Sequence, residues 1–162
     1  MERNIRPIGA TPSHTVVVGY GHRPAAVRPL FDRVGGRPTL ERVHAALYRR
    51  IYADPVLSQF FNGIPRDRQE KQLTDFMSGA LGGPKQYVGK HPRQAHSHLF
   101  ITIEMFDTRH HHLAQALMEA HVPTQFHDEW LRIDRSFGRT LTKSSPAECQ
   151  PRFGGDPIVL VK

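Results

Sequence analysis

Apolar residues in the middle of this chain recur at the three- and four-residue spacing that places side chains on one face of an α-helix. The first stripe of this kind comprises Leu40, Val43, Leu47 and Ile51. The second stripe comprises Leu73, Phe76, Met77 and Ala80. Prolines 38, 55 and 65 delimit these stripes, since proline suits the start of a helix but does not continue one. The pattern predicts two long amphipathic helices in this part of the chain.

The following part of the chain shows the same helical spacing twice more. A helix from about residue 104 to 121 is predicted from Phe106, Leu113 and Leu117. A last helix, after Pro123, is predicted from Trp130, Ile133, Phe137 and Leu141. Shorter helical pieces are expected at residues 30–34 and around Leu57, Phe60 and Phe61. The core domain is therefore predicted to be all-α and to span residues 30–141.

The two ends of the chain lack this periodicity. Residues 1–29 contain four prolines and several glycines, which predicts a flexible N-terminal extension. Residues 142–162 form a polar C-terminal tail rich in proline and glycine. The tail closes on the apolar run at residues 158–161, which is suited to pairing as an edge strand.

A long irregular segment, from about residue 85 to 102, separates the second and third of the long helices. Gly82-Gly83-Pro84 ends the helix before it, and the segment contains His91, His96 and His98. Long loops inside compact domains are uncommon and often functional. Together with the apolar segment at residues 54–61, this loop predicts a small helical pocket that holds one metal-bound cofactor, with His96 as the ligand. We expect His91 to be solvated, while His98 remains the local competitor of His96.

A second group of histidines, at residues 110–112, has the appearance of a metal cluster. Successive helical residues point about 100° apart, so adjacent histidines do not converge on one ion. A metal site there would need His91, His98 or His127 to complete it.

Composition narrows the class of protein further. A length of 162 residues fits one domain plus extensions, and the single cysteine, Cys149, excludes an internal disulfide bond. The sequence lacks an apolar run of about 18 residues and a secretion signal, so we expect a cytoplasmic protein without a membrane span. The net charge of +7 leaves a basic, haem-free nucleic-acid-binding protein as an alternative. The scattered Lys and Arg residues argue against nucleic acid as the partner.

In order and spacing, these pieces resemble the truncated haemoglobin family, and most closely its first group. The matching pieces are Phe31-Asp32-Arg33-Val34-Gly35-Gly36, Leu47-Tyr48-Arg49-Arg50-Ile51, Asp54-Pro55 with Leu57, Phe60 and Phe61, Lys71-Gln72, Ala80-Leu81-Gly82-Gly83-Pro84 with Tyr87 and Gly89, Ala95-His96 with Ile101-Thr102, and Phe106-Asp107. Each piece is weak alone, but the ordered set is specific. The resemblance implies a truncated globin fold, a two-over-two helical sandwich around haem b (iron protoporphyrin IX).

The resemblance also implies roles for individual residues along the axis of the iron. His96 is expected to be the proximal iron ligand, and Tyr48 and Gln72 are expected on the distal side, where they would donate hydrogen bonds to bound dioxygen. A single axial histidine leaves the sixth position of the iron open to a gas. A phenol and an amide in an apolar pocket would each stabilise the charge on that gas by roughly 1 kcal/mol.

Further residues are implied around the rim and faces of the haem. Phe61 would pack against the porphyrin and Phe106 would line the proximal pocket. Lys71 and Tyr87 would meet the propionates, and Phe76 would stand at the gate of the gas tunnel.

Two arginines depart from the pattern of the family. Arg68 lies one turn before Gln72, at a position that faces the ligand in relatives, and is predicted to border the cofactor as a mobile gate. Arg109 lies one turn from Phe106, where relatives are apolar or aromatic. A buried, unpaired guanidinium is costly. Arg109 must therefore point outward or meet a propionate, solvent, or a carboxylate such as Asp134.

The predicted function is reversible binding of dioxygen and other diatomic gases, including nitric oxide and carbon monoxide, for storage, delivery or sensing. The alternative is an enzyme, either a nitric oxide dioxygenase or a peroxidase-type protein at the same haem. Either enzyme would need electrons from a separate reductase.

Overall fold

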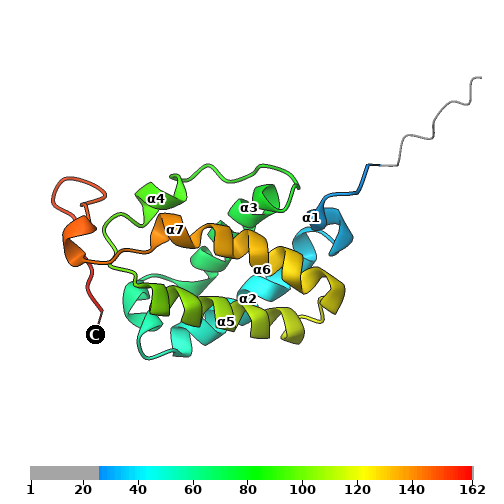
Figure 1. The fold of residues 1–162 in the computed structure, drawn as a ribbon, viewed down its shortest axis with the longest axis horizontal. Helices are drawn as coiled ribbons and strands as arrows, with labels where there is room; N and C mark the ends of the chain where they lie inside the picture. The colour runs from blue at the N-terminus through cyan, green and yellow to red at the C-terminus, as the bar shows by residue number, and fades with distance from the viewer. Residues whose placement is uncertain (1–25, 162) are drawn as a thin grey trace, which may run out of the picture.

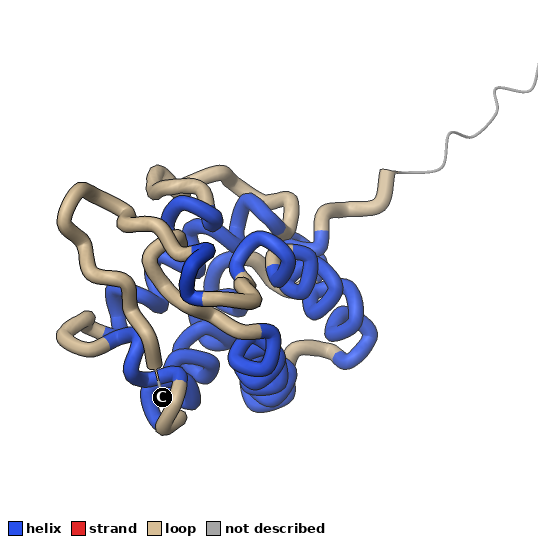
Figure 2. Tube along the Cα trace, turned by 60° about the vertical axis from the view of Figure 1, so that its left-hand side comes forward, coloured by secondary structure: helices blue, strands red, loops and turns tan. Residues whose placement is uncertain are grey.

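The computed structural model describes residues 26–161 and is built from helices joined by loops (Figure 1). In chain order the elements are α1 (Leu30–Arg33), α2 (Arg37–Ala53), η1 (Leu57–Phe61), α3 (Arg66–Ala80), α4 (Pro92–Ala95), α5 (Ile103–Glu119), η2 (Thr124–Phe126), α6 (His127–Ser136), α7 (Gly138–Leu141) and η3 (Pro146–Glu148), where η marks a 3-10 helix. Figure 2 draws this described part as helices and loops alone. The all-α prediction is confirmed. Most of the predicted N-terminal extension lies outside the described residues.

Two packed helix pairs form the body of the domain. Helix α2 packs against α3, α5 packs against α6, and contacts between α2 and α5 join the two pairs. The core between them contains the predicted stripe of α2 and, from the other pair, Leu113, Leu117 and Trp130, all at most 3% exposed. Within residues 26–161, no helix is long and apolar enough to cross a membrane.

Helix α2 ends where the sequence predicts, at the Asp54-Pro55 pair. The Asp54 carboxylate accepts hydrogen bonds from the backbone N–H groups of Val56 and Leu57, at 2.9 and 2.8 Å. These bonds satisfy donors at the start of the following 3-10 helix. The reversal lets η1 pack back against α2 and brings Phe61 beside Tyr48.

The Gly-Gly-Pro motif closes α3 because two glycines are sterically required there. Gly82 adopts φ = 85°, which disfavours any residue with a side chain. A Cβ on Gly83 would lie 2.4 Å from the ring of Phe31. The Phe31 amide also donates to the carbonyl of Leu81 at 3.0 Å, so the turn anchors α1 to the end of α3.

Two elements differ from the sequence-based expectation. The segment predicted to be irregular contains α4, a single helical turn that begins with Pro92, and one turn is too short to show apolar periodicity. The last helix is divided into α6 and α7 at Phe137. There the backbone tightens to three-residue hydrogen bonds, because Phe137 donates to Asp134 and Thr140 donates to Phe137.

The C-terminal tail lies along the segment between α4 and α5, at the orange-to-red end of Figure 1. Val159 donates to the carbonyl of His98 at 2.8 Å and accepts from the amide of Phe100 at 3.0 Å. The predicted edge strand is reduced, among the described residues, to a single parallel bridge between Val159 and Leu99. The tail is thus docked on the core.

Candidate functional site

A cavity of about 290 Å³ opens between the helix pairs and is mainly apolar. Its walls come from α2, η1, α3, α4, α5, α6 and α7, together with the segment before α5 and Arg152 of the tail. Concave apolar cavities with a few convergent polar groups are typical of cofactor sites. Seven of the nine predicted site residues line it: Tyr48, Phe61, Gln72, Phe76, Tyr87, His96 and Phe106.

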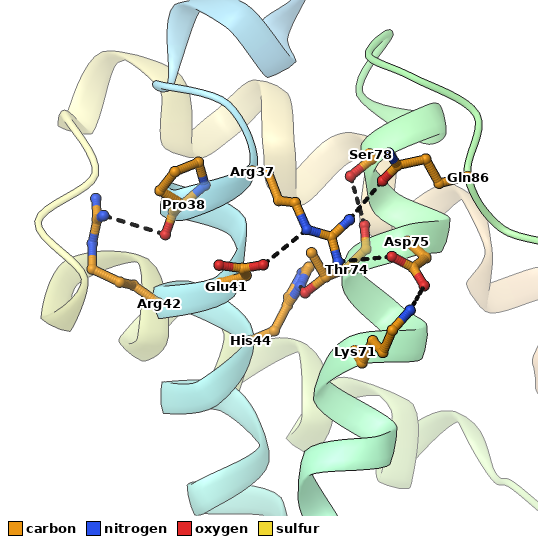
Figure 3. A network of polar contacts seen from close by, with 10 residues as sticks. All are labelled: Arg37, Pro38, Glu41, Arg42, His44, Lys71, Thr74, Asp75, Ser78 and Gln86. Carbon is orange, nitrogen blue, oxygen red and sulfur yellow. Dashed lines mark hydrogen bonds and ion pairs between the residues drawn. The ribbon is translucent and has the colours of Figure 1, made fainter.

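The other two predicted residues, Arg68 and Lys71, do not line the cavity. Both are exposed on α3, and the Lys71 ammonium pairs with Asp75 at 2.6 Å (Figure 3). Asp75 in turn pairs with Arg37 of α2 at 2.8 Å, so Lys71 belongs to a polar network that joins the outer faces of α2 and α3.

Gln69 lines the cavity although the sequence analysis did not select it. It occupies the cavity-facing position one turn before Gln72 that was assigned to Arg68. The lining residues of α3 are Gln69, Gln72, Leu73, Phe76 and Met77, and the last four lie three, four, seven and eight residues after Gln69. Helical spacing from Phe76 would have found Gln69, because these offsets share one helix face.

His96 directly follows α4, and its ring is oriented by a backbone hydrogen bond. The Nδ1 atom lies 2.8 Å from the carbonyl oxygen of Pro92. A carbonyl only accepts, so Nδ1 carries the ring proton and Nε2 is left with a free lone pair. Burial lowers the pKa of His96, although the bond to Pro92 acts in the opposite direction. The ring is therefore held neutral, in the form that ligates a metal.

His98 also lines the cavity but lacks this orienting bond. Its Nδ1 is buried and has no hydrogen-bond partner among the described residues. Burial lowers the pKa of His98 as well. The third histidine of the segment, His91, is exposed. Of the three candidates, His96 has the backbone hydrogen bond through Nδ1 that typically orients a metal-binding histidine.

The tail supports the loop that carries His96. The Lys143 ammonium donates to the carbonyl of His96 at 3.1 Å and to that of Leu99 at 2.7 Å. The Lys143 amide donates to the carbonyl of Ile101 at 2.8 Å, and the Gln150 amide donates to that of Ser97 at 2.9 Å. This loop therefore gains fixed partners from residues beyond the predicted core domain.

Tyr48 brings a polar group to the cavity wall from α2. The side chain packs edge-to-face against Phe61 and Tyr52, with ring centroids 5.8 and 6.2 Å apart. Burial raises the pKa of Tyr48 to about 12, so the phenol remains protonated near neutral pH. Buried tyrosine hydroxyls usually have a hydrogen-bond partner. No described residue provides one for Tyr48, which leaves this hydroxyl available to a ligand.

Tyr87 and Phe76 meet at the other wall. Their rings pack edge-to-face with centroids 5.4 Å apart, and Phe76 also contacts Phe137. The Tyr87 hydroxyl donates to the carbonyl of Lys90 at 2.9 Å. This bond uses the hydroxyl hydrogen and leaves the oxygen as an acceptor.

Arg109 also reaches the cavity, and of its predicted alternatives the structure shows the pairing with Asp134. Its Nη1 atom lies 2.7 Å from both oxygens of Asp134. His110 Nδ1 approaches the same carboxylate at 2.9 Å. Burial raises the pKa of Asp134, but the charge of Arg109 and the two side-chain hydrogen bonds outweigh burial and hold the pKa below its usual range. Asp134 is therefore an anion.

The histidine triplet does not form a metal site in the described part of the chain. There, no three His, Cys, Asp or Glu side chains come together in a group that would hold a metal ion. His110 bonds to Asp134, and His112 lies 3.2 Å from Asp54. Their different partners confirm that adjacent helical histidines diverge.

Comparison with known proteins identifies the family. A family model described as bacterial-like globin matches residues 29–141. This chain belongs to the bacterial-like globin family. It is 39% identical over 103 residues, 64% of its length, to a group 1 truncated haemoglobin of Mycolicibacterium paratuberculosis, of which it covers 76%. It is 34% identical over 88 residues, 54% of its length, to one of a Nostoc species, of which it covers 75%.

Solved structures confirm the two-over-two fold of this globin. The Fe(III) form of a truncated haemoglobin from Tetrahymena pyriformis superposes with a TM-score of 0.65 at 26% identity, covering 72% of this chain and all of that one. A haemoglobin from Chloroflexus aurantiacus superposes equally well, with a TM-score of 0.65 at 25% identity, covering 72% of this chain and 98% of that one.

Membership of this family implies haem b as the cofactor and diatomic gases as its ligands. The residues present fit haem b, because a neutral histidine with a free Nε2 borders an apolar, partly aromatic cavity. The family match ends at residue 141, so Lys143 and the remaining tail contacts lie outside it.

The buried His44, one turn before Tyr48, gives a pH-dependent prediction. Burial, with a smaller effect of Arg109, lowers its pKa from 6.5 to about 3. The folded protein thus binds this proton less well than the unfolded chain, so the contribution of neutral His44 is complete above pH 6.5 and is lost as the pH falls toward 3. The free energy of unfolding should fall by about 1.4 kcal/mol per pH unit from this group.

Urea unfolding at a series of pH values measures this slope. His44→Asn keeps a polar group near Thr74, whose hydroxyl lies 2.7 Å from His44 Nδ1. This variant removes the titrating group and should reduce the slope by about 1.4 kcal/mol per pH unit. His91→Asn, at an exposed position, should keep the wild-type slope. Equal slopes in wild type and His44→Asn would contradict the prediction.

Proposed function

We propose that this globin binds dioxygen reversibly at haem b, with Nε2 of His96 as the axial ligand of the iron. The observation that carries the proposal is the presence, in one cavity, of a histidine with a fixed tautomer and a tyrosine hydroxyl that has no hydrogen-bond partner within residues 26–161. Ferrous haem with one axial histidine supplies an open coordination position for a diatomic gas. The side chains of this chain then determine how long the gas stays.

The Tyr48 phenol serves as the principal donor to the gas. Its raised pKa keeps the hydroxyl hydrogen in place at neutral pH. Dioxygen draws electron density from ferrous iron, and a hydrogen-bond donor in an apolar site stabilises that charge. The amides of Gln69 and Gln72 stand on the cavity face of α3 and supply further donors. Each such bond contributes on the order of 1 kcal/mol.

The aromatic walls keep water from the same position. Phe61 packs against Tyr48, and Phe106 of α5 is only 2% exposed. A mainly apolar cavity has a low dielectric constant, which strengthens the hydrogen bonds of Tyr48 and slows oxidation of ferrous iron. These residues therefore favour a reversible complex.

The assignment of His96 is tested by absorption spectra of the ferric, ferrous and carbon monoxide-bound protein. His96→Ala should lose haem or its five-coordinate ferrous spectrum, because it removes the oriented Nε2. His98→Ala is the matched control and should keep the wild-type spectrum. An unchanged His96→Ala spectrum together with haem loss in His98→Ala would move the ligand to His98.

The role of Tyr48 is tested by stopped-flow measurement of dioxygen dissociation. Tyr48→Phe removes one hydrogen bond and should raise the dissociation rate by about 10-fold. Tyr52→Phe makes the same change one turn later on α2, where the hydroxyl donates to the carbonyl of Ile64 instead. That control should retain the wild-type rate, and equal rates in both variants would remove Tyr48 from the proposal.

Nitric oxide dioxygenation is the second candidate. Its reaction, NO + O₂ + e⁻ → NO₃⁻, needs two gases in succession and one electron from a separate reductase. Gln72 is exposed and yet lines the cavity, which marks an opening near the predicted dioxygen position. With a reductase and its electron donor supplied, a dioxygenase should consume many equivalents of nitric oxide per haem. Consumption of one equivalent only would leave dioxygen binding as the function.

A further inference from the structure

Arg109 is a mostly buried cation on the wall of the cavity, with donors that form no hydrogen bond to the part of the chain that the structure describes. Its side chain is 22% exposed, and Nη1 alone makes the two hydrogen bonds to Asp134. A guanidinium carries five N–H donors. The donors on Nε and Nη2 have no hydrogen-bond partner among the described residues, and Arg109 borders the cavity.

The charge of Arg109 acts on groups that line the cavity, Tyr48 and His96 among them. Helix α5 packs on α2, and Arg109 acts electrostatically on both His44 and Tyr48, which stand one turn apart on α2. For each of these groups burial is the largest influence on the pKa, and Arg109 is the largest charged one. His44 is neutral at physiological pH, so it does not repel an anion there or compete with Arg109 for one.

Asp134 fixes the position of this cation without closing off its remaining donors. The Asp134 side chain is 4% exposed and is also held by His110. The salt bridge offsets part of the cost of burying the guanidinium. The carboxylate binds Nη1 alone. The remaining N–H donors of the guanidinium are therefore held in a fixed orientation, which lowers the entropic cost of binding a ligand.

We propose that Arg109 and Tyr48 form a subsite for small inorganic monoanions, of the class of nitrite, azide and fluoride, at the distal position of the ferric haem. The proposal rests on the haem-binding function above. Moving an anion from water into an apolar cavity is costly unless charged donors receive it. Arg109 supplies a charged donor and Tyr48 a neutral one, whereas a neutral gas needs the latter alone.

The test is spectrophotometric titration of the ferric protein with fluoride and azide, at neutral pH and constant ionic strength. Arg109→Met combined with Asp134→Asn removes the cation without leaving a buried unpaired charge. The dissociation constants of both anions should rise by about 10- to 100-fold, as expected for loss of a hydrogen bond from a charged donor. Carbon monoxide affinity of the ferrous protein should change by less than about threefold.

The matched control is the exposed pair between the same two helices. Arg135 lies 2.9 Å from Asp107, and both side chains are about half exposed. Arg135→Met combined with Asp107→Asn makes the same chemical change and should leave the anion constants unchanged. If the two double variants bind fluoride and azide within about twofold of each other, the proposal is overturned. An equal loss of carbon monoxide affinity would also overturn it, because the effect would then be steric.

Asp134→Asn alone gives an independent test that retains Arg109. The asparagine carbonyl still accepts a hydrogen bond from Nη1 of Arg109 and keeps the guanidinium in place. Loss of the neutralising charge should therefore tighten fluoride and azide binding, which is the opposite of the effect of the double variant. Unchanged or weaker binding in Asp134→Asn would overturn the proposal even where the double variant does not fold. A wild-type protein without Soret absorption would instead refute the proposed haem function, so the two failures are distinguishable.

Discussion

The hydrogen bond between His96 Nδ1 and the carbonyl of Pro92 decides which ring nitrogen is available to a metal. That carbonyl is in place because α4 is a turn of helix, which brings residue 92 over residue 96. Pro92 starts the turn in the conformation that its ring already imposes. A segment that is otherwise irregular thus contains one helical turn, which fixes the tautomer of His96. The Nε2 atom of this cavity-lining histidine is left free to bind a metal.

Helix spacing and motif order predicted most of this arrangement from the sequence. The resemblance to the family assigned Tyr48, Phe61 and Phe76 to one haem pocket, and all three side chains line the cavity. The cavity-facing polar position on α3 was harder to predict, since Gln69 is not part of the apolar stripe. The resemblance to the family assigned this position to Arg68, which lies about 100° around the helix from Gln69. Helix α4 escaped prediction because one turn carries no period.

The pairing of Arg109 shows why a departure from a family pattern need not disrupt the fold. The sequence named Asp134 as one of several partners, but choosing among them required the packing of α5 on α6. Removing one member of a buried pair leaves the other charge without compensation, at a cost of about 3–5 kcal/mol. Arg109 and Asp134 are therefore coupled, and a change at one is expected to need a change at the other.

The docking of the tail depends mainly on backbone groups, which explains why the sequence predicted an edge strand at residues 158–161 but not the other contacts of the tail. Val159 and Gln150 bond to the loop through main-chain atoms, and any residue except proline offers the same amide. Lys143 adds a side-chain donor that reaches the carbonyl of His96 itself. Because a metal-binding histidine must be held within a fraction of an ångström, these contacts act on the same geometry as the bond to Pro92. The loop that carries His96 is thus held from two directions, by its own helical turn and by a segment outside the matched globin domain.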